Sequence, residues 1–161
     1  MYMHKIFSAA LAIYLTSLNL IAYAQSNQNH INNSGISVEI TNPWVRATVA
    51  NQKNSGGFLS IKSNQDLALV KIQADIAQKT ELHTMKMENN SMYMYAVDKL
   101  NIPKNTTIKL TGDYHIMLFG LSTKLIPQNK VRIKLFFQDS NKKIITVNKD
   151  FIVKPLSYIE E

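Results

Sequence analysis

Residues 80–97 read TELHTMKMENNSMYMYAV and carry the pattern that decides the fold. Before residue 88, His83, Met85 and Met87 lie at every second position, and after residue 91 Met92 and Met94 do the same. A period of two is that of a β-strand, whose side chains alternate between two faces. The polar cluster ENNS at residues 88–91 is typical of a tight turn. The stretch therefore predicts a β-hairpin, two antiparallel strands that meet at this turn.

Short segments of the same kind recur on both sides of the hairpin, from ISVEI at residues 36–40 to DFIV at residues 150–153. Turn-forming clusters separate them, among them Asn42-Pro43, Gly56-Gly57 and Gly112-Asp113. No stretch has a convincing helical period. Many short strands without intervening helices are typical of an all-β sandwich or barrel with Greek-key connections, and we expect that fold class.

The first 24 residues have the layout of a secretory signal peptide. Lys5 precedes an apolar run that begins at Ile6, and Ala22-Tyr23-Ala24 supplies a small-x-small cleavage site. A retained anchoring helix is the alternative, but the run is short for a bilayer core of about 30 Å and is interrupted by polar residues. The sequence has no cysteine, which excludes a lipid-anchored cysteine. We expect a soluble periplasmic protein.

The rest of the chain is expected to form one domain. Residues 25–35 are polar and aperiodic, as in a flexible leader. Residues 36–154 form the predicted β-domain, and residues 155–161 form a C-terminal tail. The net charge of +7 comes from scattered lysines, with no run of interleaved basic and aromatic residues that would indicate nucleic-acid binding. We expect a monomer.

Methionine and histidine are clustered in one part of the chain. Beyond the predicted signal peptide, every methionine lies between residues 85 and 117, and two of the three histidines, His83 and His115, flank or fall within this span. The third, His30, lies in the predicted leader. The methionines of the cluster are Met85, Met87, Met92, Met94 and Met117. This clustering is the strongest functional signal in the sequence.

Strand geometry places most of these residues on one face. The simplest register of the hairpin pairs Met87 with Met92 and Met85 with Met94, and His83 shares their face because it lies two residues from Met85. Met85, Met87 and Met92 have two possible roles, as packing residues of the core or as auxiliary ligands that shield a metal. The choice between Met92 and Met94 as a principal ligand stays open.

The ligand types select the metal. His115 and Met117 form a second pair with a spacing of two, on another predicted strand. Thioethers are soft, uncharged donors that suit Cu(I), whereas zinc prefers imidazole, carboxylate and thiolate, and calcium or magnesium prefers oxygen. A neutral ligand set predicts binding weak enough for delivery.

Three carboxylates have either a turn or surface role or the role of orienting a histidine, namely Glu81, Glu88 and Asp113.

The segments ELHTMKMENNSMYM (residues 81–94) and IPKNTTIKLTGDYHIMLFGL (residues 102–121) resemble the hallmark of the periplasmic PCuAC-type copper chaperones. In that family a His is followed by ten residues, a Met, about twenty-one residues and His-x-Met. The pattern falls here on His83, Met94, His115 and Met117, with a second interval of twenty residues. The segment ITNPWVRAT (residues 40–48) resembles the family's early strand.

The resemblance implies a cupredoxin-like Greek-key sandwich that binds one Cu(I) through His83, Met94, His115 and Met117. It also implies a carrier without enzymatic activity, which supplies the dinuclear copper centre of cytochrome c oxidase, in subunit II. The sequence departs from the family at Gly112-Asp113, where relatives have Gly-Gly. Its ending, KPLSYIEE, lacks the Met- and His-rich tail with which some relatives bind a second copper.

Several other functions conflict with the sequence. An electron-transfer cupredoxin needs a cysteine ligand, and a copper oxidase gathers more histidines than the predicted domain contains. No Gly-x-Ser-x-Gly elbow indicates a hydrolase. Two alternatives to delivery remain: copper storage or tolerance, and a β-sandwich binding module that uses no metal.

Overall fold

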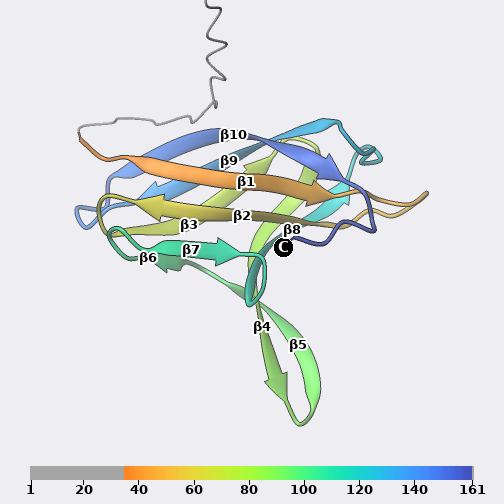
Figure 1. The fold of residues 1–161 in the computed structure, drawn as a ribbon, viewed down its shortest axis with the longest axis horizontal. Helices are drawn as coiled ribbons and strands as arrows, with labels where there is room; N and C mark the ends of the chain where they lie inside the picture. The colour runs from red at the N-terminus through yellow and green to blue at the C-terminus, as the bar shows by residue number, and fades with distance from the viewer. Residues whose placement is uncertain (1–34, 161) are drawn as a thin grey trace, which may run out of the picture.

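The computed structural model describes residues 35–160, which form ten β-strands and no helix (Figure 1). The expected all-β fold is confirmed, and no helix in this part of the chain is long and apolar enough to cross a membrane. The predicted signal peptide and nearly all of the predicted leader lie outside the described residues. The strands are β1 (Val38–Arg46), β2 (Ser55–Ser63), β3 (Leu67–Ala74), β4 (Ala77–Glu88), β5 (Ser91–Val97), β6 (Leu100–Ile102), β7 (Thr107–Leu110), β8 (Tyr114–Leu121), β9 (Lys130–Gln138) and β10 (Ile144–Lys154).

Most neighbouring strands are not consecutive in the chain. Their order is β5-β4-β8-β2-β1-β10-β9-β3-β6, and β7 pairs with β2. β1 and β10 run parallel, and the other pairs are antiparallel. Pairs such as β2–β8 and β3–β9 need long connections of the Greek-key kind. These connections bring β8 beside β4, and the candidate metal centre lies on that pair.

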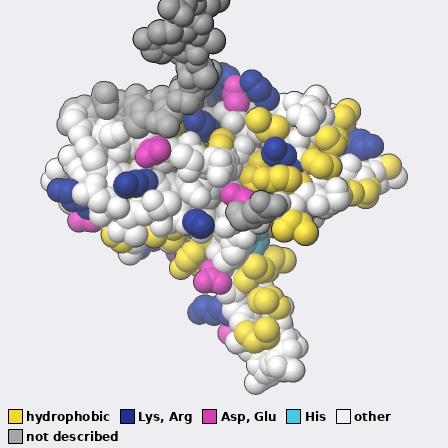
Figure 2. Space-filling model, viewed as in Figure 1, with side chains coloured by type: hydrophobic (Ala, Val, Ile, Leu, Met, Phe, Trp, Pro, Cys, Tyr) yellow, Lys and Arg dark blue, Asp and Glu magenta, His cyan; other side chains and the backbone are white. Residues whose placement is uncertain are grey.

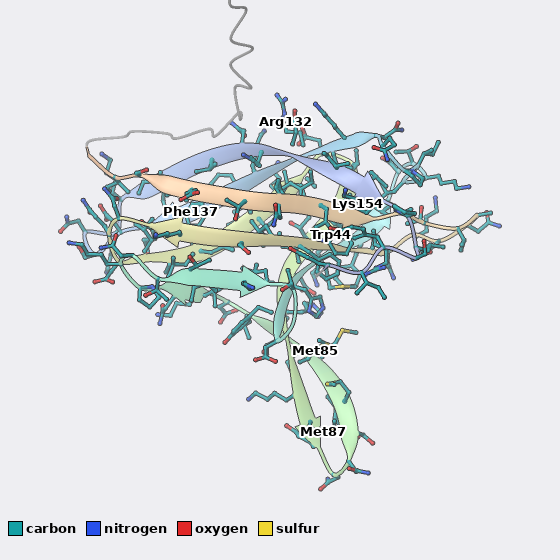
Figure 3. All side chains as sticks on the ribbon, viewed as in Figure 1. Trp44, Met85, Met87, Arg132, Phe137 and Lys154 are labelled. Carbon is teal, nitrogen blue, oxygen red and sulfur yellow. The ribbon has the colours of Figure 1, made fainter. Side chains whose placement is uncertain are left out.

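The strands enclose one core, and β9 shows how the period-two pattern builds it. Val131, Ile133, Leu135 and Phe137 are buried, whereas the residues between them are exposed or half-buried. In Figure 3, Phe137 lies within the sandwich and Arg132 lies on its outer surface. Burying each large aliphatic or aromatic side chain contributes about 1.5–3 kcal/mol, so this core supplies the main stabilisation of a chain without disulfides.

A β-bulge in β1 turns Trp44 away from the main core, although the residue stays buried at 3% exposure. The register with β2 shifts between Thr41 and Trp44, where Asn42 has a φ of 49° and Pro43 has no N–H to donate. Without the shift Trp44 would follow Ile40 into the core. Instead Val45 enters the core, and the indole stacks on Phe58 of β2 with ring centroids 4.1 Å apart.

The hairpin of β4 and β5 projects from the sandwich (Figure 1). β4 pairs with β8 only as far as Thr84, because β8 begins at Tyr114. The last four residues of β4 therefore pair with β5 alone. Asn89 and Asn90 both have positive φ, as a two-residue type I′ turn requires. The predicted hairpin and its turn at residues 88–91 are therefore confirmed.

Candidate metal centre

The two candidate histidines lie directly opposite each other on adjacent strands. His83 of β4 pairs with His115 of β8, so both side chains leave the same face, and their ring centroids are 5.9 Å apart. The His83 side chain is 12% exposed and His115 is 6% exposed. The pair lies where the hairpin leaves the sandwich. Sequence spacing predicted the shared face along each strand, and the β4–β8 register brings the two imidazoles together.

Glu81 contacts His83 from the same strand and the same face. Its Oε2 lies 2.9 Å from His83 Nε2, and its Oε1 lies 2.6 Å from Lys79 Nζ. The hydrogen bond to His83, followed by that to Lys79, lowers the pKa of Glu81, so the carboxylate is ionised and accepts a hydrogen bond donated by Nε2–H. Of the two roles considered for Glu81, the structure favours that of orienting a histidine.

The other ring nitrogen of His83 is left without a partner. Nδ1 is buried and makes no hydrogen bond with any described residue. A carboxylate that holds the proton on Nε2 leaves a lone pair on Nδ1, which is the arrangement of a metal-binding imidazole with a carboxylate behind it. A buried imidazole nitrogen without a partner costs free energy unless something binds it. The donor atoms therefore fit a metal ion.

Burial keeps His115 in the form that binds metals. Desolvation, and secondarily the charge of His83, lowers the pKa of His115. The sign follows from burial, which disfavours the imidazolium and favours the neutral ring. A neutral imidazole presents a lone pair to a metal without first releasing a proton.

The two candidate methionines lie on opposite sides of the histidine pair. Met117 of β8 pairs with Glu81, two residues from the histidine level on one side, and Met94 of β5 pairs with Met85, two residues away on the other. Two residues span about 7 Å along a strand, which a flexible thioether side chain can bridge. The register therefore brings imidazole and thioether donors to one face of three adjacent strands.

The register also separates Met94 from Met92. Met92 pairs with Met87, four residues and about 13 Å along β4 from His83. Met94 and Met85 lie at the nearer level. The predicted pairs Met87–Met92 and Met85–Met94 are both confirmed. Met87 is 64% exposed and Met92 is 59% exposed, so the alternative that these two fill gaps in the core is wrong.

Aromatic rings border the histidine pair on the side of the sandwich. Phe58 lies 6.4 Å from His115 and Phe119 lies 5.8 Å from His83, between ring centroids. Gly56 makes room for one of them, because a Cβ there would lie 2.9 Å from the Phe58 ring. Figure 2 shows a histidine between apolar side chains of the hairpin and an apolar patch on the sandwich. The aromatic rings thus shield the pair on the sandwich side.

The comparisons with known proteins fit this fold. A family model described as "Putative lipoprotein LpqE-like" matches residues 38–148, more than half of the chain. The chain belongs to the LpqE-like family. A comparison with curated proteins finds no match.

The solved structures similar to this LpqE-like chain include PCuAC domains. The apo PCuAC domain from PmoF1 has a TM-score of 0.59 at 17% identity, over 73% of this chain and 93% of that one. The copper-bound PCuAC domain from PmoF2 has a TM-score of 0.57 at 15% identity, over 73% and 92%. Cu(I)-DR1885 from Deinococcus radiodurans has a TM-score of 0.51 at 24% identity, over 78% and 80%. The resemblance to PCuAC proteins and the cupredoxin-like fold are confirmed.

The C-terminal segment of this LpqE-like chain covers the Trp44 side of the centre. Trp44 Nε1 donates to Glu160 Oε2 at 2.8 Å, and the Arg46 guanidinium donates to the carbonyl of Leu156 at 2.9 Å. A surface pocket of about 500 Å³ lies between this segment and the rings of Trp44 and Phe58. The contacts continue from Trp44 through Phe58 to His115, so the segment supports the aromatic border of the histidine pair.

Sequence reasoning missed the residues that surround the histidines. The aromatic border of Phe58 and Phe119 was not predicted, although Phe119 shares the face of His115 at a spacing of four on the same strand. For Glu81 the sequence left both a surface role and the role of orienting a histidine open, and the hydrogen bond to His83 distinguishes them. Of the three carboxylates considered, Glu88 instead accepts a hydrogen bond from the Tyr95 hydroxyl at 3.0 Å, and the Asp113 carbonyl accepts one from Met85 N–H at 2.7 Å.

Histidines and carboxylates alone do not account for a metal site here. Within residues 35–160, no group of three or more His, Cys, Asp and Glu side chains is placed to hold a metal ion. The thioethers nearest the histidine pair on the same face belong to Met85, Met94 and Met117. That donor set suits Cu(I) better than zinc or the hard divalent cations.

Proposed function

We propose that this LpqE-like protein is a periplasmic copper(I) carrier that binds one ion through His83, Met94, His115 and Met117. The observation that carries the proposal is the opposed histidine pair, with the buried, unpartnered Nδ1 of His83 and methionines to either side. The protein acts as a chaperone and not as an enzyme. The likeness to a copper-bound PCuAC domain supports the same cargo.

The donor set suits transfer better than permanent storage. Two imidazoles and two thioethers leave the charge of Cu(I) uncompensated, so this site binds more weakly than a thiolate site. Met94 is 55% exposed on a projecting strand, where a partner's ligand can replace it. Replacing ligands one at a time lets an ion pass between proteins without being released to water.

The proposed acceptor is the dinuclear copper centre of cytochrome c oxidase, in subunit II. This assignment is supported by the resemblance to PCuAC-type copper chaperones and by the chemistry of a carrier that gives up its ion. A storage protein would instead retain Cu(I) in the presence of an empty acceptor. Transfer therefore distinguishes delivery from storage or tolerance.

Replacing both histidines tests the binding site. In an anaerobic Cu(I) competition titration, His83→Ala with His115→Ala should abolish stoichiometric binding, because the site loses both imidazoles. Far-ultraviolet circular dichroism should be unchanged. His30→Ala, outside the predicted domain, is the matched control and should bind as the wild type does. Unchanged affinity in the double variant would overturn the proposal in favour of a binding module that uses no metal.

Transfer to an acceptor tests the delivery step. Purified carrier loaded with Cu(I) is mixed with the apo copper domain of an oxidase, and copper is measured in each protein after separation. We expect most of the copper to move to the acceptor. Retention by the carrier would count against delivery and in favour of storage.

A further inference from the structure

The outer part of the hairpin carries its own pair of thioethers. Met87 and Met92 are cross-strand partners beside the turn, and Met85 and Met94 form the next pair toward the sandwich. Figure 3 shows Met85 at the root of the hairpin and Met87 farther out. Side chains of directly paired residues start about 5 Å apart, so both sulfur atoms of the outer pair can approach one ion.

Packing does not explain these two side chains. Met87 and Met92 are 64% and 59% exposed, and β8 has ended before the hairpin reaches them. The opposite face of the hairpin carries Tyr93, whose partner is Lys86. The two faces therefore differ in chemistry, with soft sulfur donors gathered on the face that also bears His83. Three exposed methionines in two successive cross-strand pairs contribute little to the folding of the hairpin, but they present thioethers to solvent.

The outer pair is too far from the histidines to share their ion. Met87 lies four residues from His83 on β4, about 13 Å along the strand. An imidazole and a thioether that start this far apart do not converge on one metal ion. The Met85–Met94 pair lies between the histidines and the outer pair, about 7 Å along the strand from each.

We propose that Met87 and Met92 form a second, outer subsite for Cu(I), separate from the site at the histidine pair. This inference rests on the proposed function, because it takes Cu(I) as the cargo. Two neutral thioethers select a soft monovalent ion and bind it more weakly than a site with imidazoles. The outer subsite meets an approaching partner first, and the Met85–Met94 rung connects it to the histidines. Copper thus moves between the partner and the inner site in short steps.

Methyl NMR of the full folded chain tests the subsite. The methionine methyl groups are labelled with ¹³C, and Ag(I), a soft monovalent ion without redox chemistry at the sulfur, is the probe. The first additions should shift the methyl groups of Met94 and Met117. Further Ag(I) should then shift those of Met87 and Met92 together, with an affinity at least about tenfold weaker.

Two variants separate this inference from the proposed function. In His83→Ala with His115→Ala the Met87 and Met92 shifts should persist, because their subsite needs no imidazole. In Met87→Leu with Met92→Leu the weak event should vanish while the strong one is retained. If the strong event is absent in the wild type but the weak one is present, the proposed function fails and the outer subsite stands.

Other outcomes would overturn the subsite. Met87 and Met92 methyl groups that stay unshifted at saturating Ag(I) would show that the outer pair binds no soft metal. Shifts in the wild type that disappear in the histidine variant would make these methionines ligands of the inner site. A shift of only one of the two methyl groups would contradict a paired subsite.

Discussion

In the sandwich most of the large apolar side chains are buried, whereas in the outer hairpin they face solvent. Phe137 and Leu59 are fully buried, while Met87 and Met92 are more than half exposed. Within the described residues no methionine belongs to the buried core, although methionine is a common gap-filler there. Burial of apolar residues thus stabilises the sandwich, whereas the hairpin methionines add little to the core and have the proposed role of metal ligands. The histidine pair lies at the boundary between the two regions.

The largest expected effect on stability comes from the sandwich. Phe137→Ala removes a fully buried aromatic ring and should lower the free energy of unfolding by about 3–5 kcal/mol. Tyr93→Ala, a matched deletion on the hairpin, should cost less than about 1 kcal/mol, because Tyr93 is 47% exposed. Urea denaturation monitored by circular dichroism measures both. Equal losses would show that the hairpin contributes to the same cooperative core.

Much of the hairpin could be predicted from sequence because its interactions are local. The turn at residues 88–91 and the alternation on either side fix the partners Met85–Met94 and Met87–Met92 without knowledge of the rest of the fold. The short strand β6, by contrast, was not predicted, because three residues are too few to show a period. The bulge that turns Trp44 away from the main core also depends on the register of β1 with β2, which the sequence pattern does not reveal.

The candidate site could be predicted only in part for the same reason. Spacing gave the candidate residues and their shared face on each strand. That His83 meets His115 depends on the register of β4 with β8, which are separated by three other strands in the chain. The role of Glu81 depends on side-chain geometry, since a carboxylate two residues from a histidine is common on any exposed strand.

The next largest effect is expected on copper affinity at the histidine pair, which lies between the sandwich and the hairpin. Glu81→Gln removes the carboxylate that holds the proton on His83 Nε2, and loss of such a partner typically weakens metal binding about 10–100-fold. Cu(I) competition titration measures the change, and thermal unfolding of the metal-free protein should be almost unaffected. Glu88→Gln is the matched control, because Glu88 bonds to Tyr95 and not to a histidine. Equal Cu(I) affinity in the two variants would contradict a positioning role for Glu81.

The smallest expected effect is on stability, and it tests most directly whether the hairpin methionines, unlike the apolar residues of the sandwich, contribute nothing to a core. Met87→Leu with Met92→Leu keeps two apolar side chains of similar volume on the hairpin and removes only the sulfur atoms. Without metal, the free energy of unfolding should stay within about 0.5 kcal/mol of the wild type, because both positions are largely exposed. Chemical denaturation with and without a chelator measures it. A loss well above 1 kcal/mol would mean that these methionines pack as a small core of their own. Apolar packing would then stabilise the hairpin as well as the sandwich, and the contrast between the two regions would be wrong.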